Sequence, residues 1–156
     1  GGHPTPILQS KYVIAYPEFS PDGKWLAYTS DESSRNEVYV QPYPGPGPRQ
    51  QVSTEGGKAP AWSRRGEMFY TAELATGVKR LMSVPFTVTP SFGAGTPRKL
   101  FEGTYGNQFA TRDYDVSLDG QTFYLTQLKQ RPPIRATHMV LVQNWVDELT
   151  RRVPTK

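Results

Sequence analysis

The chain has 156 residues, of which 36% are hydrophobic and 12% aromatic, and it contains 14 glycines and 15 prolines. Aromatic residues and turn formers in this proportion favour many short strands over a few long helices. The absence of cysteine excludes disulfides and thiolate metal sites. The net charge is +4, but the basic residues are scattered singly or in pairs, so we expect no nucleic-acid partner.

No apolar run approaches the roughly 20 residues of a membrane helix, so this segment is not expected to insert into a membrane. Residues 1–4 lack a charged region followed by an apolar stretch, and we therefore expect no signal peptide within the sequence. The first predicted element is residues 5–10, which read as the outer strand of a blade that has no other strand in this chain.

Three segments then share one pattern, at residues 19–30, 62–71 and 116–125. Each has an apolar residue, a serine, two turn residues, a glycine, a polar residue and an aromatic-rich strand. The glycine suits the positive φ of a tight hairpin turn. The interval from Gly23 to Gly66 fits a four-stranded propeller blade. The longer interval to Gly120 predicts an insertion, which we place at residues 87–96.

The remaining strands complete three blades, at residues 11–54, 58–103 and 107–143. Third strands are predicted at 37–41, 80–84 and 138–142, and outer strands at 49–53 and 98–101. The last blade has no outer strand. The predicted fold is all-β, with about three four-stranded antiparallel blades in residues 1–143 that form part of a six-bladed ring.

A short helix is predicted to close the chain, within a C-terminal segment at residues 144–156. Asn144 and Asp147 resemble a capping box, and Pro154 prevents continuation of the helix. Val146, Leu149 and Val153 recur at helical spacing and predict one apolar face. The chain end, residues 154–156, reads as a natural terminus.

The runs at 19–30 (FSPDGKWLAYTS) and 37–40 (EVYV) resemble the WD-repeat-like blades of TolB-type propellers. The ending 144–149 (NWVDEL) is similar to the tail of bacterial serine/threonine kinase–propeller fusions, although no kinase motif occurs here. The resemblance implies a propeller fold and says almost nothing about function, because propellers host many unrelated activities. A periplasmic or extracytoplasmic location is expected in preference to a cytoplasmic one.

Candidate catalytic groups are few, and structural roles are favoured for all of them. His3 and His138 lack partners at metal-ligand spacing. The serines Ser20, Ser63 and Ser117 recur in every copy, which favours a hydrogen bond within each turn over a nucleophile. The acidic loop 31–37 lacks the spacing of a calcium loop. We therefore predict no catalytic, cofactor-binding or metal-binding residues.

Aromatic residues offer the one candidate binding surface. Tyr12, Tyr16, Tyr105 and Tyr114 flank the predicted innermost strands, where they could contact a ligand or pack against the core. The strand aromatics are expected to form the core between blades: Trp25, Tyr28, Phe69, Tyr70, Phe123 and Tyr124.

The predicted function is a non-enzymatic binding or scaffolding module for a protein or peptide, and the chain could be the sensor part of a larger signalling protein. The alternative is the propeller gate of a prolyl-oligopeptidase-like hydrolase without its catalytic domain. Three blades cannot close a ring, so we also expect a homodimer with six blades. In that dimer, residues 5–10 of each copy would complete the last blade of the other.

Overall fold

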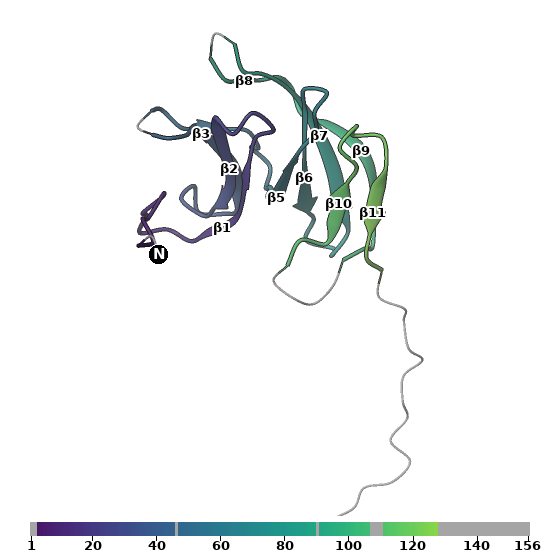
Figure 1. Ribbon diagram of the computed structural model, residues 1–156. Coiled ribbons are helices and arrows are strands. Elements are labelled where there is room, and N and C mark those ends of the chain that lie inside the picture. Colours follow the sequence, from purple (N-terminus) through teal and green to yellow (C-terminus); the bar gives the residue numbers. More distant parts are fainter. Residues whose placement is uncertain (1–2, 46, 90, 107–110, 128–156) are drawn as a thin grey trace, which may run out of the picture.

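The computed structural model describes residues 3–45, 47–89, 91–106 and 111–127. All regular secondary structure in these residues is β-strand (Figure 1), as the sequence predicts. The predicted strand 138–142, with His138, and the predicted C-terminal helix both lie outside the described residues. No helix within the described part of the chain is long and apolar enough to cross a membrane.

The first sheet is a four-stranded antiparallel meander, in which each strand pairs with the next along the chain. Its strands are β1 (Ile14–Phe19), β2 (Trp25–Ser30), β3 (Glu37–Pro42) and β4 (Gln50–Gln51). Strands β3 and β4 lie where a third strand and an outer strand were predicted. Strand β3 is more buried than its alternating sequence suggests, because both of its faces are covered and even Glu37 is inaccessible to solvent.

The second sheet repeats this order and adds one hairpin. Its strands are β5 (Lys58–Trp62), β6 (Glu67–Glu73), β7 (Lys79–Thr87) and β9 (Arg98–Gly103), with β8 (Gly93–Ala94) paired to the far end of β7. The predicted insertion at 87–96 is this hairpin, which extends beyond the sheet in Figure 1. It carries Phe92 back against Trp25, with ring centroids 5.4 Å apart.

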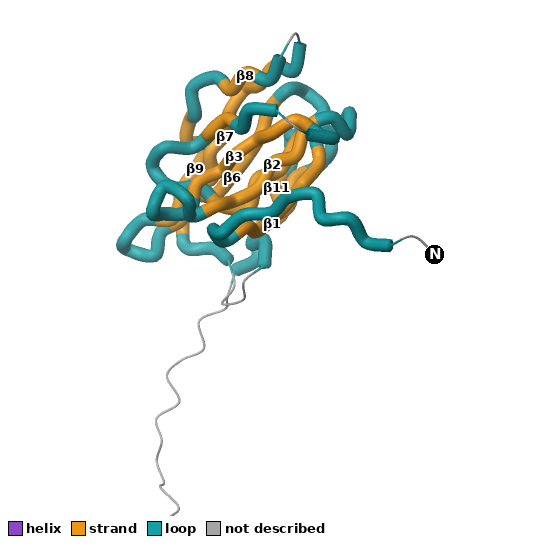
Figure 2. The backbone as a smooth tube through the Cα atoms, turned by 90° about the vertical axis from the view of Figure 1, so that its left-hand side faces the viewer, coloured by secondary structure: helices purple, strands orange, loops and turns teal. Residues whose placement is uncertain are grey.

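The third sheet has two described strands, β10 (Tyr114–Val116) and β11 (Phe123–Leu125). Figures 1 and 2 show the three sheets side by side, face against face, with β1, β5 and β10 as the first strand of each. The hairpin turns 20–24, 63–66 and 117–121 lie at one end of the sheets, which we call the turn end (upper in Figure 1). The connections 31–36, 52–57 and 74–78 lie at the opposite end, the loop end.

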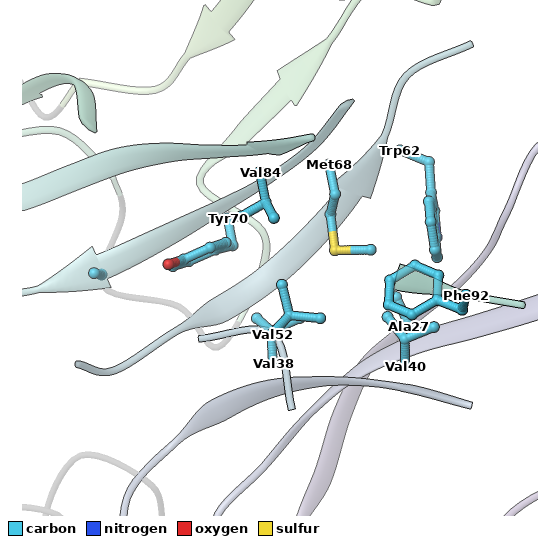
Figure 3. Packing of buried hydrophobic residues seen from close by; sticks show 10 residues of the cluster. Ala27, Val38, Val40, Val52, Trp62, Met68, Tyr70, Val84 and Phe92 are labelled. Atoms are coloured by element: carbon cyan, nitrogen blue, oxygen red, sulfur yellow. The ribbon is translucent and has the colours of Figure 1, made fainter. Parts of the chain in front are cut away.

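Two apolar clusters hold the sheets together. The cluster between the first and second sheets includes Val38, Val40, Met68, Tyr70 and Val84, all almost inaccessible to solvent (Figure 3). The cluster between the second and third sheets is built on Phe69, Leu81 and Tyr114, with Phe123 packed against it. The second sheet contributes apolar side chains to both clusters, one on each of its faces. Burial between blades is therefore the main stabilising term of the fold.

The middle copy of the repeat is one residue shorter than the sequence pattern implies. The backbone N–H of Ser20 and of Ser117 donates to the carbonyl five residues later, whereas Ser63 donates to Glu67, four residues later. The polar residue after the glycine therefore lies in the turn of the first and third copies, but Glu67 already belongs to strand β6. This corrects the sequence alignment of the three copies by one position and exchanges the two faces of the middle strand.

The three recurring serines hold their turns, as the sequence predicts. Ser20 Oγ donates to Asp22 and accepts from the Trp25 N–H at 3.0 Å. Ser117 makes the same pair of bonds to Asp119 and Thr122. These bonds lower the pKa of the Asp22 and Asp119 carboxyl groups. The middle turn lacks the aspartate, and Ser63 Oγ there accepts from two backbone N–H groups.

The two outward faces of the described sheets differ. Leu26, Tyr28 and Tyr39 face away from the second sheet and are covered by Leu8 and Ile14, which lie before and at the start of β1. Residues 5–10 form no strand in this chain, so their predicted role in a neighbouring blade stays a prediction.

At the other outward face, Tyr124 is 63% exposed. The prediction that Tyr124 is core is therefore wrong for the described part of the chain, because no blade covers this face there. In the corrected register, Ala27, Phe69 and Tyr124 occupy the same position of successive blades, and the first two are buried between sheets.

Candidate functional site

The innermost strands of the first two sheets share a bulge that was not predicted from the sequence. The register of β1 shifts between Ala15 and Glu18, and that of β5 shifts between Lys58 and Ala61. Tyr16 and Ala59 lie in these bulges with φ of 53° and 55°, an uncommon conformation for residues other than glycine.

Each bulge residue lies four residues before the serine of the turn and is followed directly by a proline. Proline is tolerated here because these strands are sheet edges, where no ladder hydrogen bond is lost. The repeated Pro17 and Pro60 were the sequence signal that could have revealed the bulges.

Glu18, which follows the bulge in β1, forms several polar contacts between the inner strands. Its carboxylate accepts from the backbone N–H of Trp62 at 3.2 Å, and its backbone carbonyl accepts from the Trp62 indole N–H at 3.1 Å. The same carboxylate forms an ion pair with Arg112, and this guanidinium also donates to the Pro60 carbonyl at 2.7 Å. One cluster of side chains therefore joins all three sheets.

Tyr114 lies in the core behind this ion pair. It is 3% exposed, and its hydroxyl donates to the Ala59 carbonyl at 2.7 Å. Burial raises the pKa of this phenol well above its usual value. The hydroxyl satisfies a carbonyl that the bulge in β5 would otherwise leave unpaired, so this tyrosine has a structural contact that any ligand contact would have to replace.

Tyr105 and the adjoining ion pair lie at the loop end of the same cluster. The Tyr105 hydroxyl is buried and has no hydrogen-bond partner among the described residues, and burial raises its pKa to about 12. Its ring lies 5.9 Å from that of Phe101. Lys79 and Asp113 form a partly buried ion pair beside Gly106.

The structure thus brings together three of the four tyrosines predicted as binding residues. Tyr16 packs against the second apolar cluster, Tyr114 belongs to it and Tyr105 adjoins it. Tyr12 lies apart, 38% exposed, beside the ammonium of Lys11. That these four side chains bind a ligand stays a prediction.

The acidic loop between β2 and β3 uses its carboxylates in separate structural contacts. Asp31 accepts from the Val13 N–H at 2.9 Å, and Glu32 pairs with Arg49 at 2.6 Å. Glu37 is buried and bonded to Arg35, Ser53 and the Gly56 N–H. No group of three residues able to hold a metal ion occurs in the described ranges. His3 is exposed.

These features define a protein built of β-propeller blades. They are the four-stranded antiparallel meander, the Ser-x-x-Gly turn at the same end of each blade, and the packing of successive sheets face to face.

Comparison with known proteins agrees with this class. Stretches of the chain are 42% identical over 53 residues to the Tol-Pal system protein TolB of Pseudomonas aeruginosa and 47% identical over 57 residues to that of Nitrosococcus oceani. These stretches cover 34% and 36% of this chain, and 12% and 13% of the two relatives. No protein-family model matches the chain.

The fold comparison gives the same result. A solved structure assigned as TolB from Agrobacterium tumefaciens superimposes with a TM-score of 0.51 at 16% identity, over 62% of this chain and 36% of the other. At that identity the match supports the fold alone. The resemblance to kinase–propeller fusions stays a prediction.

Proposed function

We propose that this chain is a non-enzymatic protein-binding module that engages a protein or peptide through the loop end and inner strands of its blades. The observation that carries the proposal is the similarity to TolB proteins, whose name assigns them to a Tol-Pal system. A periplasmic or extracytoplasmic location and a sensor or scaffolding role in a larger protein are part of the same proposal.

The geometry supports a rigid binding surface. The inner strands are fixed by the contacts of Glu18 and Arg112, and the connection 52–57 is fixed by the bonds of buried Glu37 to Ser53 and Gly56. A preorganised surface loses little conformational entropy when a partner binds. The charged groups of Glu18, Arg112 and Glu37 are thus already paired within the fold.

Binding can be tested with the folded chain as bait. A random-peptide phage library is selected against it, and purified components of a Tol-Pal system are titrated one at a time by calorimetry. We expect saturable binding with one partner per propeller and a dissociation constant in the micromolar range. The control is the chain unfolded in urea.

The proposal would be contradicted if no selected peptide and no component bound saturably at concentrations up to 100-fold above the expected dissociation constant. So would turnover of a peptidase, esterase or kinase substrate that a single substitution in this chain abolishes.

The expected homodimer, with six blades, is a further part of the proposal. The exposed Tyr124 supports it, because that register position is buried between sheets in the preceding blades. In a ring of two copies, this face would meet the outward face of the first sheet. Light scattering distinguishes the dimer from a monomer.

A further inference from the structure

A small cavity opens at the loop end, between the first and second sheets. Its volume is about 270 Å³, close to the lower limit of typical ligand sites. Its wall is the connection 54–56 on one side and strands β6 and β7 on the other, and its lining includes Glu55, Tyr70, Leu74, Arg80 and Met82.

Tyr70 contributes a polar group at the inner end of this cavity. Its side chain belongs to the core between the sheets and is 3% exposed. Figure 3 shows its hydroxyl pointing away from Met68 and Trp62. This hydroxyl makes no hydrogen bond to any described residue. Unlike the Tyr105 hydroxyl it is not fully buried, so it is accessible from the cavity.

The charges that act on this hydroxyl are negative. Burial raises the pKa of Tyr70 to about 12, with smaller contributions from the charges of Glu37, buried behind Gly56, and Glu55, on the cavity rim. Glu55 makes no ion pair with the described residues. The one cation of the lining, Arg80, is paired with Glu102 at 3.3 Å. The cavity therefore has an acceptor and a free carboxylate at its polar side.

The rest of the cavity lining is mainly apolar. Leu74 and Met82, with Ala72 and Pro97, provide a wall for an alkyl chain. A lysine side chain combines such a chain with a terminal ammonium that donates three hydrogen bonds. A carboxylate would meet the charge of Glu55, and a planar guanidinium would need more polar partners than this lining has.

We propose that this cavity binds a lysine side chain of the partner, with the methylene chain against Leu74 and Met82 and the ammonium bonded to Tyr70 and Glu55. The proposal rests on the proposed protein-binding function, to which it adds the chemistry of one anchoring residue. The Tyr70 hydroxyl accepts from the ammonium, and Glu55 neutralises its charge.

The test uses the full chain and two small probes, Nα-acetyl-lysine methylamide and its norleucine analogue, titrated by NMR. We expect the lysine probe to shift the Gly56 and Leu74 amide signals and to bind at least about fivefold more tightly than norleucine, which lacks the ammonium. The substitutions Tyr70→Phe and Glu55→Gln should each weaken the lysine probe at least about threefold. Glu73→Gln, which removes a loop-end carboxylate outside the cavity, is the matched control and should change binding less than twofold.

Equal binding of the two probes, tighter binding of Nα-acetyl-glutamate methylamide, or unchanged binding to both variants would overturn the proposal. Tyr70→Phe and Glu55→Gln are also tested against the peptides selected for protein binding. If these peptides bind the variants as well as the original chain, the lysine site is wrong and the protein-binding function stands. If no peptide or protein binds while the lysine probe does, the protein-binding function is wrong.

Discussion

Glu18 and Arg112 form an ion pair that joins the innermost strand of the first sheet to the segment leading into the third. Both side chains are about a quarter exposed. Each also bonds the backbone of the second sheet, Glu18 at the Trp62 N–H and Arg112 at the Pro60 carbonyl. The pair therefore connects three blades whose apolar clusters are separate.

The first prediction is that this pair couples the outer blades. Glu18→Gln keeps an oxygen acceptor for the Trp62 N–H but removes the charge, and Arg112→Gln removes the other charge. Each should lower the free energy of unfolding by about 1–2 kcal/mol, since a partly buried charge is left without its partner. The double variant should cost less than the two single variants added together, by at least about 0.5 kcal/mol. Urea unfolding measures all three.

The matched control is the surface pair Lys99 and Glu102, whose side chains are nearly half exposed. The same double-mutant cycle there should give a coupling of no more than about 0.5 kcal/mol. Equal coupling at the two pairs would show that the Glu18–Arg112 contact carries no special role between blades.

Most of the strand order was predictable from the sequence, because the Ser-x-x-Gly turns and the period-two strands are local signals. The extra hairpin at 87–96 was predictable as an insertion from the interval between turns. The one-residue deletion before Glu67 was not, since a polar residue follows the glycine in every copy and only the hydrogen bond of Ser63 shows where the strand begins.

The inner-strand contacts were harder to predict from sequence, because they join residues far apart in the chain. The ion pair of Glu18 spans 94 positions, and no local pattern marks Arg112 as its partner. Tyr114 was predicted only as a residue near the inner strands, whereas its burial follows from the packing of two sheets. The prolines after Tyr16 and Ala59 were the one local signal in the sequence for this site.

The second prediction concerns two turn glycines with the same φ of 70° but different surroundings. A Cβ at Gly23 would meet no atom within 4 Å, whereas one at Gly120 would lie 3.1 Å from Ser63 Cβ. Gly23→Ala should therefore cost only the strain of a positive φ, about 1–2 kcal/mol. Gly120→Ala should cost about 1–3 kcal/mol more, since it also crowds the neighbouring turn. Thermal and urea unfolding of the two variants test the difference.

Gly23→Asn serves as the control, because asparagine tolerates this conformation better than alanine does, and it should be more stable than Gly23→Ala. Valine at either position should be worse than alanine. Equal losses for Gly23→Ala and Gly120→Ala would mean that the contact between the second and third turns is wrong.

The third prediction is a loss of stability at alkaline pH. Tyr70 and Tyr105 each have a pKa raised to about 12 by burial, against 10.0 for an ordinary tyrosine. Between pH 10 and 12 the unfolded chain loses these protons and the folded chain keeps them, so the free energy of unfolding falls as the pH rises. The stability present below pH 10 should decrease by up to about 2–3 kcal/mol for each residue.

Urea unfolding at pH 9 to 11.5 measures this decrease. Tyr70→Phe and Tyr105→Phe should each remove part of it, and the double variant should remove both parts. A decrease that is unchanged in the double variant would show that these two phenols do not keep their protons in the fold.

The fourth prediction uses equivalent positions to test whether another blade covers the outward face of the third sheet. Phe69 and Tyr124 share a register position, but Phe69 is 1% exposed and Tyr124 63%. Phe69→Ala should cost about 3–5 kcal/mol at any protein concentration. If the face stays open, Tyr124→Ala should cost no more than about 0.5 kcal/mol. In the proposed dimer, Tyr124→Ala should cost several times more, and its effect should grow with protein concentration.

Deletion of residues 1–10 then distinguishes two ways of forming that dimer. If these residues complete the last blade of a second copy, as the sequence predicts, their removal should abolish the dimer. In the structure, however, Leu8 covers Leu26, Tyr28 and Tyr39 on the face that a second copy would need. Removing this cover should instead expose the face and strengthen dimer formation, because apolar area becomes available for burial. Light scattering of both chains from 1 to 100 µM decides between these results, and a monodisperse monomer in every case would contradict the six-bladed ring.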